Sequence, residues 1–130
     1  MNKKEEQEKA LLRHTKRMAA LRAAKTGTMN NSKWAKIFRL INDHIGGGDT
    51  LAKMLGGENL YPMPPETYSE DLRGYSADGP AGPLKLDEIE YLAVPLPAHT
   101  DLHALSAAIN RLGRYDFTLE EGRLTIYGYR

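Results

Sequence analysis

Between residues 32 and 45, apolar residues recur about every third or fourth position while charged side chains take the opposite side. Residues at that spacing share one face of a helix, so the pattern predicts an amphipathic helix whose apolar face enters the core. Asn31 or Ser32 is expected to cap the first turn, and the glycines from Gly46 to Gly48 end the helix. The predicted core-facing residues are Trp34, Ile37, Phe38, Ile41 and Ile45.

Further along the chain, a strand pattern precedes a second helical pattern. Residues 89–94 alternate with a period of two and end at a proline, which predicts a strand. Residues 102–112 then carry a helical repeat of apolar residues, with Thr100 or Asp101 as the cap and Gly113 as the stop. This part of the chain is therefore expected to form a strand followed by a helix.

Residues 115–130 contain two alternating runs around Glu121 and Gly122, which predicts a β-hairpin. With these two residues in the turn, charge faces charge and apolar faces apolar across the strands. Residues 50–55 fit either a short helix or a strand, and the close glycines favour the strand. The predicted cross-strand pairs are Glu120 with Arg123, Leu119 with Leu124 and Phe117 with Ile126.

Together these elements predict an α+β fold with a small, mostly antiparallel sheet of about four strands covered by two helices. Two parts of the chain differ in charge. Residues 1–28 hold eight Lys or Arg and three Glu, a balance of +5, whereas residues 29–130 hold ten basic and fourteen acidic residues, a balance of −4. Helix-forming residues dominate the first part, which we interpret as an extra, loosely attached and detachable basic helix. Residues 29–130 form the single domain, and a start of translation at Met29 stays open as an alternative.

The composition fits a globular protein of one domain. A chain of 130 residues with 41% apolar content is long enough for a core without metals or cross-links. No stretch approaches the roughly 20 apolar residues of a membrane-spanning helix, and no secretory signal is visible, so we expect a cytoplasmic protein. Cysteine is absent, which excludes disulfides, thiolate catalysis and cysteine zinc sites.

None of the familiar catalytic or cofactor motifs is complete. The three glycines are not followed by the Lys and hydroxyl residue of a P-loop. His99 and His103 have the spacing of a metal-binding pair, but the predicted cap places His99 before the helix, and no third ligand has a telling spacing. The serines lack a glycine-flanked elbow, and acidic residues adjacent on a strand point to opposite faces. We therefore predict no catalytic residue, no metal and no cofactor, and lean against an enzyme.

Residues 56–88 are the most informative segment, because this long run is rich in Gly, Pro and Tyr and has little hydrophobic periodicity. The segment holds seven acidic and two basic residues, a balance of −5. Loops of this length are functional or disordered, and tyrosine supplies contact area at a low entropic cost. We predict a contact surface for a basic protein; a rigid covering whose tyrosines pack on the sheet stays open as the alternative. The predicted contact residues are Tyr61, Tyr68, Tyr75, Glu66, Glu70, Asp71 and Asp78.

Three segments resemble an uncharacterised family of small bacterial cytoplasmic proteins: NNSKWAKIF at residues 30–38, LDEIEYLAV at residues 86–94 and TLEEGRLTIYGYR at residues 118–130. The resemblance covers most of residues 29–130 and leaves the basic arm outside. It implies a bacterial setting and an α/β body. Because the matching segments are structural, it implies no activity and no site residues.

Our leading hypothesis is a non-enzymatic binding protein that neutralises a basic partner, in the way bacterial immunity proteins block cationic nuclease toxins. Opposite potentials steer such encounters and speed association. A second hypothesis is a nucleic-acid-associated or regulatory protein that uses the basic arm, because phosphate contacts need only clustered Lys and Arg. A third is an enzyme of unrecognised type in a cleft beneath the loop. The arm residues concerned are Lys3, Lys4, Lys9, Arg13, Lys16 and Arg17.

Overall fold

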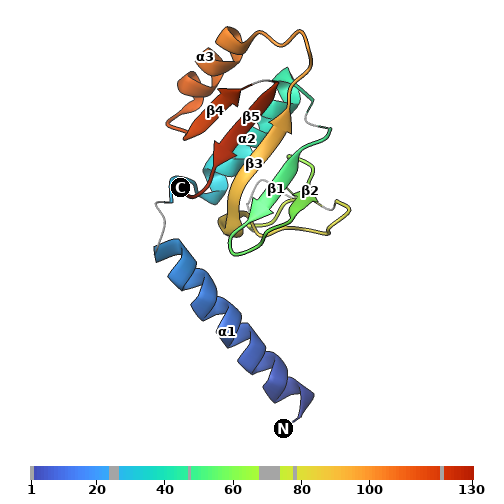
Figure 1. Cartoon of the computed structure of the whole chain (residues 1–130), viewed down its shortest axis with the longest axis vertical. Helices are drawn as coiled ribbons and strands as arrows, with labels where there is room; N and C mark the ends of the chain where they lie inside the picture. Colours follow the sequence, from blue (N-terminus) through green and yellow to red (C-terminus); the bar gives the residue numbers. More distant parts are fainter. Residues whose placement is uncertain (1, 24–26, 47, 68–73, 78, 121) are drawn as a thin grey trace.

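A computed structural model of the chain shows an α+β fold built on one antiparallel sheet in the order β2-β1-β3-β5-β4 (Figure 1). The structure describes residues 2–23, 27–46, 48–67, 74–77, 79–120 and 122–130. The predicted fold class is confirmed, with five strands instead of about four. The helices are α1 (Lys3–Ala23), α2 (Asn31–His44) and α3 (Leu102–Leu112), and the strands are β1 (Leu51–Met54), β2 (Leu60–Pro62), β3 (Ile89–Pro95), β4 (Phe117–Glu120) and β5 (Arg123–Tyr127).

The additional strand is β2, which lies inside the segment predicted to be a long loop. It pairs with β1, so that Tyr61 lies opposite Ala52 and Leu60 opposite Lys53. Three residues that end at a proline are too short to show an alternating pattern, which is why the sequence did not reveal this strand. Its partner β1 forms in the region where a strand was favoured over a helix.

Helix α2 forms where the apolar period predicted it, but its cap lies one residue earlier than expected. The side chain of Asn30, rather than that of Asn31 or Ser32, accepts a hydrogen bond of 2.8 Å from the backbone N–H of Lys33. The helix ends as predicted before the glycines: Gly46 has a φ of 88° and donates its N–H to the carbonyl of Ile41 at 3.0 Å.

The second half of the domain matches its predicted elements closely. Asp101 caps α3 by accepting from the N–H of Ala104 at 3.0 Å, and Gly113 follows the last helical residue. Gly122 in the hairpin turn has a φ of 76°, a conformation that favours glycine. The register of the hairpin is the predicted one, with the pairs Glu120 with Arg123, Leu119 with Leu124 and Phe117 with Ile126.

Helices α2 and α3 bury their apolar faces against one face of the sheet, and in Figure 1 α2 lies behind the strands. Trp34 is 1% exposed and contacts the ring of Phe38, whose centroid lies 5.7 Å away. The sheet supplies the apolar side chains of β3 and β5 that face these helices. Met63 and Leu86, both from the predicted loop, complete this core, so part of the loop is structural.

One irregularity in β3 separates a charged residue from the core. The pairing of β1 with β3 shifts between Lys53 and Met54, which interrupts the alternation of side chains at Glu90. As a result Ile89 and Leu92 both reach the core, although residues three positions apart on a regular strand point to opposite faces. The carboxylate of Glu90 instead forms an ion pair with the ammonium group of Lys53. This shift explains why a largely buried strand tolerates a glutamate.

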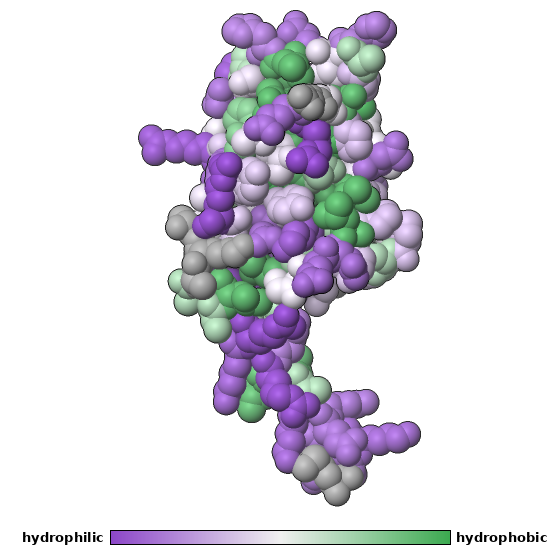
Figure 2. Space-filling view, viewed as in Figure 1, coloured by the Kyte–Doolittle hydropathy of each residue, from purple (hydrophilic) through white to green (hydrophobic). Residues whose placement is uncertain are grey.

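Helix α1 extends away from the body in Figure 1, and its far end is mostly hydrophilic in Figure 2. Met18 is its buried side chain, whereas Leu11 and Leu12 are exposed. Within the described residues, no helix combines the length and apolarity needed to cross a membrane. Whether residues 1–28 can be removed without loss of the fold stays a prediction.

We expect Trp34→Ala to lower the free energy of unfolding by roughly 3–5 kcal/mol, because the change loses transfer energy and leaves a cavity under α2. Denaturant titration measures this loss. Lys36→Ala on the exposed side of the same helix is the control and should change stability by less than about 0.5 kcal/mol. A loss below about 1 kcal/mol for Trp34→Ala would contradict its role as a core anchor.

Candidate functional site

The main candidate site is a groove between α1 and the segment that runs from the end of β1 to the start of β3. It has a volume of about 700 Å³, and we call it the arm–loop groove. Apolar and aromatic side chains form much of its wall, and a few charged groups stand among them. Residues that characterise the groove are Leu11, Tyr61, Tyr75, Leu84, Lys85 and Glu88.

Basic side chains on one face of α1 hold the arm against the body. His14 Nε2 lies 2.7 Å from the carboxylate of Glu88, and the guanidinium group of Arg22 lies 3.4 Å from that of Asp87. Arg17 donates a hydrogen bond of 2.7 Å to the carbonyl of Gly56. The basic arm and the acidic end of residues 56–88, which the sequence presents as separate features, therefore contact each other directly.

The turn at Gly56 is shaped for this contact. Its φ of 75° favours glycine, and a Cβ atom there would lie 2.8 Å from both the guanidinium nitrogen of Arg17 and a methyl carbon of Leu21. The neighbouring Gly57 is different, because a Cβ atom on it would have an ordinary contact of 3.6 Å with a backbone oxygen. The close contact of α1 with this turn therefore requires glycine at position 56 and not at position 57.

The described parts of residues 56–88 are tied together by backbone hydrogen bonds. Ala77 donates to the carbonyl of Glu66 and Ser76 to that of Leu84, each at 2.8 Å. The buried hydroxyl of Ser76 in turn accepts from the N–H of Leu84 at 2.9 Å. These bonds give Tyr75 a fixed backbone to project from, and the pairing of β2 with β1 does the same for Tyr61.

The structure brings together two of the predicted contact residues. Tyr61 is half-buried and Tyr75 is 43% exposed, and both line the arm–loop groove. Glu66 is exposed but does not line the groove. The remaining predicted residues, Tyr68, Glu70, Asp71 and Asp78, lie outside the described residues.

Sequence reasoning missed the contribution of α1 and of the 3₁₀ turn Leu86–Glu88 to this groove. Leu11, Met18 and Leu21 recur at helical spacing in the arm, and this thin apolar stripe is the signal in the sequence that α1 packs against another part of the chain. His14 and Glu88 carried no signal, because a pair that is 74 residues apart leaves no local pattern.

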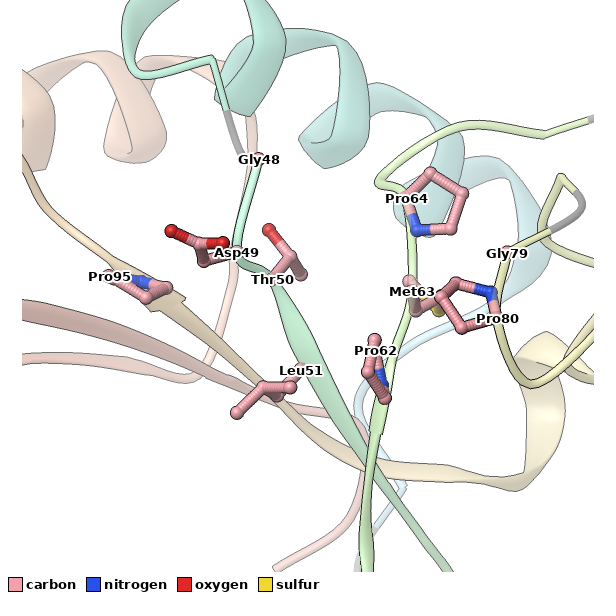
Figure 3. Close-up of a pocket in the computed structure, with 10 residues that line it drawn as sticks. All are labelled: Gly48, Asp49, Thr50, Leu51, Pro62, Met63, Pro64, Gly79, Pro80 and Pro95. Atoms are coloured by element: carbon pink, nitrogen blue, oxygen red, sulfur yellow. The ribbon is translucent and has the colours of Figure 1, made fainter.

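A second cavity, of about 480 Å³, lies where β1 begins and β2 ends (Figure 3). Prolines from three segments form much of it, and Gly79 approaches so closely that a Cβ atom on it would lie 2.7 Å from the ring of Pro64. Asp49 and Thr50 supply its polar side chains, and the rest of the lining is apolar or glycine. This lining offers a shape for binding and no acid–base pair. The prolines are Pro62, Pro64, Pro80 and Pro95.

A third hollow contains a tyrosine with a perturbed pKa, but its groups are engaged in holding the backbone. Burial raises the pKa of Tyr115 above its ordinary value. Its hydroxyl donates to the carbonyl of Lys33 at 3.2 Å, and the Lys33 ammonium lies 5.2 Å from the centre of its ring. The same ammonium donates to the carbonyls of Thr28 and Arg114 at 2.9 and 2.6 Å. We infer that this cluster holds the start of α2 and the start of β4 together.

The two histidines with metal-like spacing are separated by the start of α3. His99 precedes the helix and His103 lies in its first turn, and both are exposed. Across the part of the chain that the structure describes, no three or more His, Cys, Asp or Glu side chains gather in a way that could hold a metal ion.

Comparison with known proteins returned no matching family model, no matching curated protein and no matching solved structure. The resemblance of three segments to an uncharacterised bacterial family stays a prediction.

We expect Gly56→Ala to destabilise the protein by about 1–3 kcal/mol, because alanine is strained at a positive φ and its methyl group collides with α1. Gly57→Ala is the matched control and should cost less than about 0.5 kcal/mol. Chemical denaturation of both variants compares them. Equal stability of the two variants would show that α1 does not press on Gly56.

Proposed function

We propose that the protein is a non-enzymatic binding module that engages a partner protein through the arm–loop groove. The observation that carries this proposal is the convergence of Tyr61 and Tyr75, which is 43% exposed, on the side of the groove that the body supplies. Aromatic side chains beside exposed apolar surface are typical of contact surfaces, where they act as anchors. The groove offers such anchors on an ordered backbone.

The partner that we propose is basic, as a cationic nuclease toxin blocked by a bacterial immunity-type inhibitor would be. The balance of −5 over residues 56–88 supports this, because opposite potentials raise the rate of encounter. Glu66 is an exposed member of that acidic set at the described part of the loop. Inhibition of this kind needs binding and no catalytic group.

With a partner captured from cell lysate, Tyr61→Ala and Tyr75→Ala should speed dissociation at least tenfold, because buried aromatic anchors contribute about 2 kcal/mol or more. Glu66→Gln should mainly slow association and weaken its dependence on salt. Surface plasmon resonance at low and high salt separates the two effects.

The control is Leu102→Ala on α3, which removes a side chain with 44% exposure, close to that of Tyr75, from another surface. It should leave both rates unchanged. Unchanged dissociation for both tyrosine variants would place the contact surface elsewhere on the molecule.

A second candidate function is binding of a nucleic-acid backbone by the outer face of α1. Lys9, Arg13 and Lys16 follow an i, i+4, i+7 spacing, which puts them on one face, opposite the face that contacts the body through His14 and Arg22. Among the described residues these three cations form no ion pair, so they are available to phosphates. Figure 2 shows this projecting part as mostly hydrophilic.

If this candidate is right, Lys9→Gln/Arg13→Gln/Lys16→Gln should weaken binding to a labelled 20-base-pair duplex and reduce the slope of log K against log salt by about 3. Fluorescence anisotropy at several salt concentrations measures the slope. The control, Lys36→Gln/Arg39→Gln/Arg111→Gln, removes the same charge from exposed positions on α2 and α3. Equal effects of the two triple variants would rule out a specific role for α1.

A further inference from the structure

We propose that the surface under α1 is a docking site for a basic helix of the partner, and that α1 is its internal occupant in the isolated chain. The inference rests on the proposed function, since it concerns the same partner, and it adds the chemistry of the contact. It also makes the arm a competitor that the partner must displace.

The polar contacts show what kind of segment this surface accepts. It presents the carboxylates of Asp87 and Glu88 and the carbonyl of Gly56, which are all acceptors. The arm contacts these acceptors through His14, Arg17 and Arg22, which lie on one side of the helix. From Lys9 onward, α1 has no acidic side chain. Another helix with cations at this spacing would satisfy the same three acceptors.

The arm is held weakly, which is what an exchangeable occupant requires. Met18 is the buried side chain of a helix that is 21 residues long. The Arg22–Asp87 pair is half-exposed, and ion pairs at such positions contribute little to stability. Most of the stability of a helix in a protein comes from tertiary packing, so docking and helix formation support each other.

The rest of the groove gives a partner helix an advantage over α1. Tyr75 remains 43% exposed while the arm is docked, so α1 leaves part of the apolar surface of the body uncovered. A partner with large apolar side chains next to its cations would cover Tyr75 and Tyr61 as well. The tyrosines therefore discriminate between the internal occupant and the partner.

Competition from an internal occupant has a quantitative signature. When a site is occupied by its own arm nine-tenths of the time, the apparent affinity for an added ligand falls about tenfold. Release of the arm removes that reduction, whereas loss of the two carboxylates on the body weakens binding.

The test uses the full chain and a fluorescein-labelled synthetic peptide with the sequence of residues 3–23 as the probe, with anisotropy as the readout. His14→Gln/Arg17→Gln/Arg22→Gln releases the arm and should bind the peptide about tenfold more tightly than the unmodified chain. Asp87→Asn/Glu88→Gln should bind it at least tenfold more weakly than the released chain. A peptide of the same composition in scrambled order should not bind.

The matched control is Lys36→Gln/Arg39→Gln, which removes two cations from exposed positions on α2 and should bind the peptide as the unmodified chain does. Circular dichroism checks that each variant is folded, and Arg17→Gln alone replaces the released triple variant if that variant unfolds. Equal peptide binding by the released and unmodified chains overturns the inference.

Absence of peptide binding by all the chains overturns it too, because the surface would then not accept a basic helix. Neither result touches the proposed function, which is judged by the dissociation rates of Tyr61→Ala and Tyr75→Ala from the captured partner. Failure of the inference and failure of the proposed function are thus distinguishable.

Discussion

The packing of α2 against β3 and the end of β5 is the contact on which the rest of the structure depends. At its centre, Gly128 passes so close to the strand that a Cβ atom on it would lie 2.2 Å from the carbonyl oxygen of Ile89 and 3.1 Å from the ring of Trp34. Interiors are packed too densely to absorb such an intrusion without a shift. This tight seam fixes β3 in the middle of the sheet, and β1, β2 and the segment after them are attached to β3 from one side.

Because the central strand is fixed in this way, the charged residues next to it lie in defined places. The acidic 3₁₀ turn immediately precedes β3, so the position of the central strand fixes the position of its carboxylates. The carbonyl of Glu88 also accepts a hydrogen bond of 2.8 Å from Leu55 at the end of β1. Asp87 and Glu88 are thus presented by a rigid support, while the helix that they hold has a single buried anchor in Met18. The body therefore offers a rigid surface, and α1 is attached to that surface by few buried contacts.

The elements that repeat a local pattern were predictable, and the contacts between distant segments were not. The apolar period around Trp34 and the turn at Gly122 specify α2 and the hairpin register locally, so both follow from short windows of sequence. The strand β2, by contrast, has three residues and becomes a strand because β1 is beside it. The irregularity at Glu90 likewise depends on pairing with a partner strand. In the groove, tyrosine content marked Tyr61 and Tyr75, but the approach of Arg17 to Gly56 joins residues 39 positions apart and leaves no trace in either segment.

The strand order has a consequence for how the chain folds as it is made. β5 lies between β3 and β4 although it follows both in sequence, and β3 and β4 are parallel because each pairs antiparallel with β5. During synthesis, β3, α3 and β4 therefore emerge before the strand that joins them exists. Until residues 123–127 have been made, β3 has an unpaired edge, and the apolar faces of α2 and α3 lack part of the surface that covers them. A nascent chain in that state exposes the kind of strand edge and apolar surface that chaperones recognise.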